Sequence, residues 1–298
     1  EYNNALKQRG SLTFWIEEGF KETWYASSSG LTKRGRPFLY SDTCIKVLAT
    51  LRYIYKLTLR QLEGFVRSLF SLLKIDLPVP AFSRLSRRFA NSLSDITYPS
   101  LNGNIDFVID STGLKVHGEH EWIKPKQGHA YKRKVWRKLH IGIDGEGVVR
   151  ASTMTTHKVN DRACFAPLID ALDVDYIDGV LADAGYDSHA AYHDCARKNI
   201  RPLIPPPHNA KLSKRKDASL QRNNTIAYVK EKGIHAWKKK HDYGRRNRVE
   251  NTFFRIKTLF GCHLLSRTWN NQAKESMLLC TLLNKMTLLG MPRSVKIC

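Results

Sequence analysis

One stretch near the end of the chain constrains the fold most, because its apolar and polar residues recur with the period of an α-helix. At about 100° per residue, an arc of about 60° contains Tyr243, Arg246, Glu250 and Lys257. An adjoining arc of about 60° contains Val249, Phe253, Ile256 and Phe260. The sequence therefore predicts a helix, starting near Tyr243, whose polar stripe borders the core.

This polar stripe has two interpretations. A carboxylate, a guanidinium, an ammonium and a phenol beside a core suit a site that binds a metal ion and phosphate oxygens. Alternatively, Arg246 and Glu250, four residues apart, form an ion pair on an ordinary surface helix. Two aspartates earlier in the chain favour the first interpretation.

Each of these aspartates belongs to an apolar run of strand length. Asp110 lies in Ile105–Thr112 (IDFVIDST), and Asp183 follows Gly179–Ala182. We expect both at the carboxyl ends of strands, where open α/β sheets bind ligands. With Glu250 they would form a site that needs a cation, because two like charges about 4 Å apart cost about 4 kcal/mol at an effective dielectric near 20. Hard oxygen ligands indicate Mg²⁺ or Mn²⁺.

These segments resemble those of bacterial DDE transposases of the insertion-sequence-5 type. The resemblance rests on IDST around Asp110, on ADAGYD around Asp183, and on the spacing Tyr243-x2-Arg246-x3-Glu250-x6-Lys257. It extends over nearly the whole chain, through residues 34–42, 135–140, 202–205 and 288–292. It implies an RNase H-like domain in which the two aspartates and the glutamate bind two Mg²⁺ or Mn²⁺ ions. The tyrosine, the arginine and the lysine would then position the DNA phosphates.

The activity that the resemblance implies is DNA transposition. The protein would bind the terminal inverted repeats of its insertion sequence, nick them and join the 3′-OH to target DNA, as a homodimer in a synaptic complex. A two-metal reaction of this kind needs no covalent enzyme intermediate. Two alternatives stay open: an RNase H-like nuclease or recombinase without strand transfer, and a non-catalytic DNA-binding derivative.

The charge of the chain independently indicates a polyanionic partner. Lys and Arg number 49 against 27 Asp and Glu, a formal net charge of +22. A membrane surface is the main rival to DNA, but no apolar run reaches the roughly 20 residues that span a bilayer, and the start shows no signal-peptide pattern. The six cysteines have no paired spacing typical of zinc or disulfides. We therefore expect a cytoplasmic protein with reduced thiols.

Residues 1–101 are predicted to form a small all-α DNA-binding region. Helical periodicity over about 41–56, 58–74 and 81–92 indicates a helix-turn-helix-like order, and Thr58 and Gln61 form a capping box. The third helix presents on one face the candidate DNA contacts Arg84, Arg87 and Arg88. The alternative is that these arginines only solvate a helical bundle.

A basic segment precedes these helices at residues 33–37 (KRGRP). It looks like the core of an AT-hook, in which arginines enter an A·T-rich minor groove. Arg34 and Arg36 are therefore candidate DNA contacts. A flexible basic linker is the alternative interpretation.

Residues 102–298 are predicted to form an α/β catalytic domain with a mixed five-stranded sheet. The turn-rich residues 144–147 indicate a β-hairpin with Asp144 in its turn, and residues 199–205 would supply the fifth strand. We expect Asp187 to cap the helix after the fourth strand. A basic insertion is expected at about 206–242. The apolar segment 273–289 is expected to pack on the sheet, and it could also contribute to a dimer.

Before the hairpin, residues 124–138 interleave aromatic and basic side chains. Trp136 lies beside Arg137 and Lys138, a pattern that suits unstacked bases next to phosphates. The same half of the chain contains His117, His120, His129 and His140. Their spacings match no zinc-finger pattern and no cysteine lies nearby, so we predict no zinc site.

Overall fold

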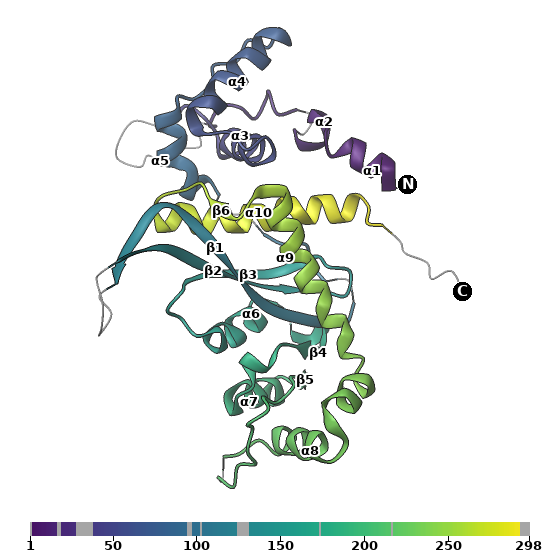
Figure 1. Ribbon diagram of the computed structural model, residues 1–298. Helices are drawn as coiled ribbons and strands as arrows, with labels where there is room; N and C mark the ends of the chain where they lie inside the picture. Colours follow the sequence, from purple (N-terminus) through teal and green to yellow (C-terminus); the bar gives the residue numbers. More distant parts are fainter. Residues whose placement is uncertain are drawn as a thin grey trace. The chain divides into compact units, whose positions relative to one another are not determined.

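The structure is a computed structural model that describes residues 2–16, 19–27, 38–93, 97–101, 103–123, 131–172, 174–215 and 217–292. Contacts divide the chain into two compact units, residues 1–97 with 259–298, and residues 98–258 (Figure 1). The first division lies close to the boundary predicted near residue 102. The prediction assigned residues 259–298 to the catalytic domain, however, whereas their contacts group them with the N-terminal helices. Within the described ranges, no helix is both long and apolar enough to cross a bilayer.

The first unit is mostly helical. It contains α1 (Tyr2–Gln8), α2 (Leu12–Trp15), α3 (Asp42–Ile54), α4 (Leu59–Leu72), α5 (Phe82–Ser92), the short strand β6 (His263–Leu264) and α10 (Trp269–Leu289). Helices α3, α4 and α5 confirm the three predicted helices. Ser41 caps α3 by accepting a hydrogen bond from the Cys44 amide at 2.9 Å, and the Thr58 amide donates to Gln61 Oε1 at 3.0 Å.

The core of this unit forms where α3, α4 and α5 pack together. Trp24, Leu48 and Val66 are fully buried in it, with Leu62 and Leu85 almost so. The segment expected to pack on the sheet forms α10, whose helical neighbours within this unit are α3 and α5. The apolar spacing of that segment predicted a packed helix, but an apolar pattern does not say which partner the helix has.

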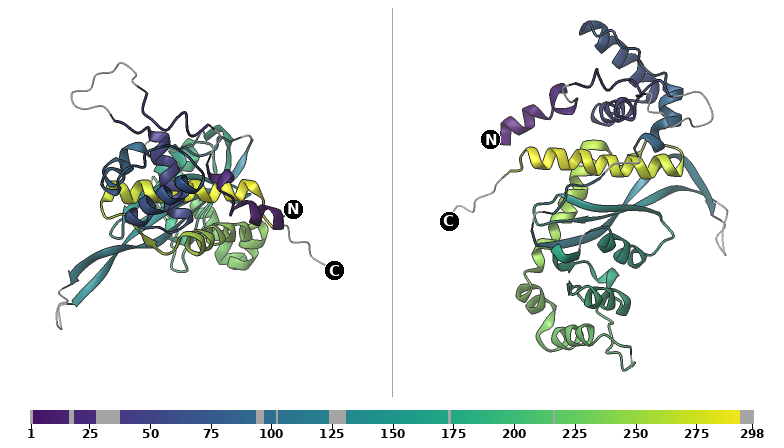
Figure 2. Two further views of the ribbon diagram at one scale, coloured as in Figure 1. Left: turned by 90° about the horizontal axis from the view of Figure 1, so that it is seen from above. Right: turned by 180° about the vertical axis from the view of Figure 1, so that it is seen from behind.

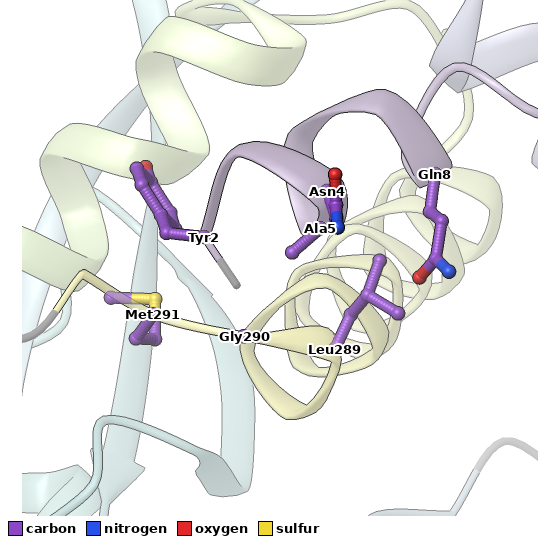
Figure 3. Close-up of a pocket in the computed structure, with 7 residues that line it drawn as sticks. All are labelled: Tyr2, Asn4, Ala5, Gln8, Leu289, Gly290 and Met291. Atoms are coloured by element: carbon purple, nitrogen blue, oxygen red, sulfur yellow. The ribbon is translucent and has the colours of Figure 1, made fainter.

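In the same unit α1 lies beside the C-terminal end of α10 (Figure 3). Arg9 donates hydrogen bonds to the carbonyl oxygens of Met286 at 3.2 Å and Gly290 at 2.8 Å, near a helix end whose last carbonyls lack partners within the helix. A cavity of about 470 Å³ lies between the two segments. Its lining consists of Tyr2, Asn4, Ala5, Gln8, Leu289, Gly290 and Met291.

The second unit is built on a mixed sheet. Its strands are β1 (Ile105–Ile123), β2 (Tyr131–Ile143), β3 (Val149–Thr156), β4 (Ile177–Leu181) and β5 (Arg201–Leu203). They lie in the order β3-β2-β1-β4-β5, with β2 antiparallel to both neighbours and β4 parallel to both. The predicted hairpin and fifth strand are therefore confirmed, and the sheet with its helices is consistent with an RNase H-like fold.

Strand β1 is longer than predicted. Its parallel pairing with β4 ends at Val108 and Leu181, but its antiparallel pairing with β2 continues to Ile123. The two strands run on as a ribbon (Figures 1 and 2). The expectation that Asp110 ends a strand was wrong: Asp110 lies within β1, opposite Ile141 and just past the end of β4. Beyond about residue 112, β1 is held by backbone pairing with β2, which does not depend on apolar side chains. The apolar run in the sequence therefore ends before the strand does.

Short 3-10 helices and α-helices complete this unit. They are η1 (Asp161–Cys164), α6 (Phe165–Asp170), η2 (Val174–Tyr176), η3 (Ala184–Tyr186), α7 (His189–Arg197), α8 (Leu220–Lys240), η4 (Tyr243–Arg246) and α9 (Asn247–Phe260), the last of which crosses into the first unit. Phe107 and Ile109 share a buried core with residues of α6 and α7, which cover that face of the sheet. A Cβ atom on Gly142 would lie 1.8 Å from the Phe107 ring, so this close packing requires glycine.

Two aspartates were predicted to have local roles in turns. Asp144 is confirmed as a turn residue, since its Oδ1 accepts from the amides of Glu146 and Val148 at 2.9 and 3.0 Å. The prediction that Asp187 caps a helix was wrong. Ser188 caps α7 by accepting from the Ala191 amide at 3.2 Å, and the Asp187 carboxylate instead binds a distant arginine.

The predicted insertion at about 206–242 contains α8. Ile226 and Trp237 are its buried residues, and Gly233 interrupts it with a φ of 84°, which kinks the helix.

Candidate functional site

Three carboxylates surround one guanidinium in the second unit. Arg246 Nη2 lies 2.6 Å from Asp110 Oδ2 and 4.0 Å from Asp183 Oδ2. Its Nη1 donates to Glu250 Oε1 at 2.7 Å. The structure thus brings together the three predicted metal ligands and one predicted phosphate contact.

Each carboxylate reaches this point from a different element. Phe107 and Ile109 face α6 and α7, so by strand alternation Asp110 points to the opposite face, toward η4 and α9. Asp183 lies two residues past β4 and caps η3, accepting from the Gly185 amide at 2.8 Å. Glu250 is in the first turn of α9, where the helix dipole favours an anion.

The helix that carries Glu250 begins later than predicted. Tyr243 and Arg246 belong to the 3-10 helix η4, and the α-helix starts only at Asn247. Since a 3-10 helix has three residues per turn, these two side chains still share a face. The Tyr243 hydroxyl donates to the Ala182 carbonyl at 2.7 Å, and burial raises the pKa of the phenol, which stays protonated.

The three carboxylates differ in their exposure to solvent. Asp110 is 14% exposed, Asp183 is 44% exposed and Glu250 is 57% exposed. Burial raises the pKa of Asp110; the Arg246 guanidinium opposes that shift, and the neighbouring carboxylates add to it. The surroundings of Asp110 therefore disfavour its ionisation, and a shifted pKa of this kind is typical of functional sites.

The oxygen donors of the three carboxylates are of the type that a divalent cation prefers. Three oxygen donors of negative charge meet around one positive group, and Mg²⁺ and Mn²⁺ prefer oxygen ligands of this type. Over the described residues, no three His, Cys, Asp or Glu side chains stand close enough together to hold a metal as they are. Arg246 occupies the position between Asp110 and Glu250 and donates a hydrogen bond to each.

The other predicted contacts of this unit lie farther from the carboxylates. Lys257 is half-buried on α9, seven residues or about 10 Å along the helix from Glu250. Trp136, Arg137 and Lys138 lie on β2 where it pairs with β1, with the first and third on one face.

Of the four candidate zinc ligands, the structure describes the side chain of His140. His140 is buried, its Nε2 lies 2.8 Å from Thr155 Oγ1, and burial lowers its pKa to about 4. His129 and the side chains of His117 and His120 lie outside the described residues.

In the first unit the three candidate arginines have different surroundings. Arg88 donates to Asp42 Oδ1 at 2.5 Å and to the Tyr40 carbonyl, whereas Arg84 and Arg87 are exposed on α5. The described ranges do not include Arg34 and Arg36.

Sequence reasoning missed a second polar cluster, centred on Asp161. Its carboxylate accepts from Ser111 Oγ at 2.9 Å and from Lys138 Nζ at 2.7 Å. The sequence signal was the polar stretch 157–162 (HKVNDR) directly after β3, but nothing local relates it to Ser111, 50 residues earlier.

The second unit thus combines a mixed sheet with acidic residues on β1, after β4 and on a later helix. Two family models, each described as a transposase DDE domain, match residues 7–119 and 102–285. The second covers more than half of the chain and includes Asp110, Asp183 and Glu250. The chain therefore belongs to the DDE transposases, metal-dependent enzymes that cut and join DNA. The insertion-sequence-5 subtype stays a prediction.

Proposed function

We propose that this transposase binds the terminal inverted repeats of its own insertion sequence, nicks them and joins the freed 3′-OH to target DNA. The observation that supports this most directly is the meeting of Asp110, Asp183 and Glu250 around Arg246, in a chain of a DNA-cutting and DNA-joining family.

We infer that these three carboxylates hold two Mg²⁺ or Mn²⁺ ions. Bound there, the ions would stabilise charge on the phosphoryl oxygens and lower the pKa of an attacking water. For the protein, the main change concerns Arg246, which loses its place between Asp110 and Glu250. A guanidinium binds phosphate through paired N–H donors, so the released Arg246 can hold the DNA backbone beside the carboxylates.

Tyr243 has a different role from Arg246. Phosphate oxygens only accept hydrogen bonds, and the single O–H of Tyr243 already donates to the Ala182 carbonyl. We therefore infer that Tyr243 is a positioning residue, which fixes η4 against the turn that carries Asp183. The phosphate contacts in this signature then fall to Arg246 and Lys257.

We further infer that the remaining predicted contacts bind DNA away from the reacting phosphate. On the second unit these are Trp136, Arg137 and Lys138, and on the first unit Arg84 and Arg87, with Arg34 and Arg36 in the basic segment. Two ends must be joined in one reaction, which favours a synaptic complex with two copies of the chain.

The test is to incubate the protein with candidate inverted-repeat DNA, a target plasmid and Mg²⁺, and to sequence any joints. We expect joints at the 3′ ends with the wild-type protein and none with Glu250→Gln. Nicked ends without joints would identify a nuclease, and DNA binding without nicks would identify a non-catalytic derivative. Either result would overturn the proposal.

A further inference from the structure

A second cavity, of about 530 Å³, lies in the second unit beside the Asp161 cluster. It is lined by Lys138, His157, Lys158, Val159, Asn160, Asp161, Arg162 and Gly185. Ser111 Oγ reaches Asp161 from β1, on the face of the sheet that α6 and α7 cover, which is the face opposite to Asp110. The cavity is therefore distinct from the site around Arg246.

The charges that line this cavity suit an anion. They comprise three cations and one carboxylate, and the carboxylate, Asp161, is bound by Lys138 and Ser111. Burial opposes the ionisation of Asp161, but these hydrogen bonds outweigh it and lower the pKa of the carboxyl. Lys138 is thus neutralised locally, and Lys158 and Arg162, whose side chains are exposed, bring two further positive groups to the lining.

Two short paths connect this cavity with the catalytic aspartates. Ser111 donates its hydroxyl to Asp161 and its amide to Asp110 Oδ1, the latter at 2.8 Å. Gly185 accepts from Arg162 Nε and donates its amide to Asp183 Oδ1, both at 2.8 Å. Ser111 therefore links Asp161 to Asp110, and Gly185, which lines the cavity, bonds Asp183 directly.

The end of β4 brings the two faces of the sheet together at this point. β4 stops at Leu181, opposite Val108, and Asp110 and Ser111 follow directly on β1, pointing to opposite faces. A DNA strand with one phosphate at Asp110 and Asp183 can pass the end of β4 and place its next nucleotide in the cavity.

We propose that this cavity binds one unpaired nucleotide of the cleaved DNA strand, next to the phosphate that reacts. Lys158 and Arg162 hold its phosphate, and its base lies on His157, whose ring centroid is 5.5 Å from that of Trp136. A cavity of about 530 Å³ is of a size that takes a ligand such as one nucleotide. This inference rests on the proposed function, because it assumes that the carboxylates cut DNA.

The test compares two DNAs without metal, by fluorescence anisotropy in EDTA. One probe is a blunt duplex and the other is the same duplex with a short single-stranded extension, tried at its 3′ and at its 5′ end. We expect the wild type to prefer one extended duplex. In the double variant Lys158→Gln, Arg162→Gln, the ratio of the affinities for the extended and the blunt duplex should fall about tenfold, as expected for a lost charge-assisted contact. Its affinity for the extended duplex should also depend less steeply on salt, by about 0.7 in the log–log slope.

A matched control removes the same charge elsewhere in the same unit. Lys230→Gln with Lys239→Gln changes two exposed residues of α8, and the ratio of the two affinities should stay as in the wild type. His157→Ala should lower the ratio, and His157→Phe, which keeps a flat ring, should largely restore it. Lys158→Gln alone leaves the Arg162 hydrogen bond to Gly185 intact and should still lower the ratio.

An unchanged ratio in the Lys158 and Arg162 variant, or an equal loss for both DNAs, would overturn the proposal. Preference for free deoxynucleoside monophosphate over the extended strand would also overturn it, because the cavity would then be a nucleotide site unconnected with DNA. None of these measurements needs cleavage. A wild type that shows the preference but makes no joints would therefore refute the proposed function and leave the cavity assigned.

Discussion

Two ion pairs of the second unit, both largely shielded from solvent, show how the same chemistry can serve structure in one place and function in another. Asp187 receives two hydrogen bonds from Arg222, at 2.8 and 2.6 Å, and its side chain is 1% exposed. Asp110 receives one hydrogen bond from Arg246, whose other amino group binds Glu250. An arginine that serves a single carboxylate fixes the structure around it. An arginine that is shared among three carboxylates can exchange them for other partners.

The two pairs also differ in how well the charges are balanced. One carboxylate, Asp187, faces one guanidinium, Arg222, and two hydrogen bonds join them, as in a bidentate pair. Around Arg246 there are more carboxylates than cations, and burial together with these neighbours keeps the pKa of Asp110 raised. That imbalance is what a divalent cation would remove.

The largest expected effect separates the pairs by activity. Asp110→Asn, Asp183→Asn or Glu250→Gln removes one negative oxygen ligand, and we expect joining to fall by about 10³-fold or more, since a metal ion contributes several kcal/mol to the transition state. Counting joints per unit time measures this. Without metal, the same variants should bind end DNA as tightly as the wild type or slightly tighter, because less negative charge faces the phosphates. Full activity of Glu250→Gln would remove Glu250 from the site.

The next effect separates them by stability. Asp187→Ala leaves Arg222 buried without its partner, and the free energy of unfolding should fall by about 3–5 kcal/mol, measured by urea denaturation. The double variant Asp187→Leu, Arg222→Leu removes both charges and should recover much of the loss. If Asp187→Ala is as stable as the wild type, the comparison between the two pairs fails.

The sequence predicted the three carboxylates because the information about them is local. Asp110 and Asp183 follow apolar runs, and Glu250 sits on a helical stripe, so each could be placed on its element without knowledge of its partners. The hairpin and the fifth strand were likewise predicted from local patterns.

The pair of Asp187 and Arg222 could not be predicted in the same way. Its members are 35 residues apart, and Asp187 stands before a serine that caps α7, so the local pattern suggested a cap. The cluster of Ser111 and Asp161 was missed for the same reason. Contacts between distant segments depend on packing, which periodicity does not describe.

A third prediction uses pH to sharpen the comparison. The folded state raises the pKa of Asp110 above its unfolded value near 3.9, so folding favours the protonated carboxyl. This contribution is present in acid and is lost as pH rises through the folded pKa. Without metal, Asp110→Asn should therefore be more stable than the wild type at neutral pH, and the difference should disappear toward pH 4. Urea unfolding at several pH values measures it; a wild type that is more stable at neutral pH would contradict the sign.

The smallest effect concerns the arginines of α5. Arg84→Ala and Arg87→Ala should each lower the log–log salt slope of duplex binding by about 0.9 if each contacts one phosphate. Arg88 is held by Asp42, a partner that is 55% exposed, so Arg88→Ala should cost about 1 kcal/mol of stability or less. Equal salt slopes for all three variants and the wild type would leave these arginines as solvation of the helix.

The helix α9 has a consequence for how sequences of this kind can change in length. Val249, Phe253 and Ile256 are buried on it, and Glu250 sits one residue from the first of them. One residue inserted between Arg246 and Glu250 would turn the glutamate by about 100° relative to the arginine, so the two side chains could no longer share one face of the helix. Among residues 206–218 ahead of α8, those that the structure describes are all at least partly exposed. Descendants of one ancestral gene can therefore gain or lose residues there, while the interval from Tyr243 to Lys257 has to be inherited at fixed length.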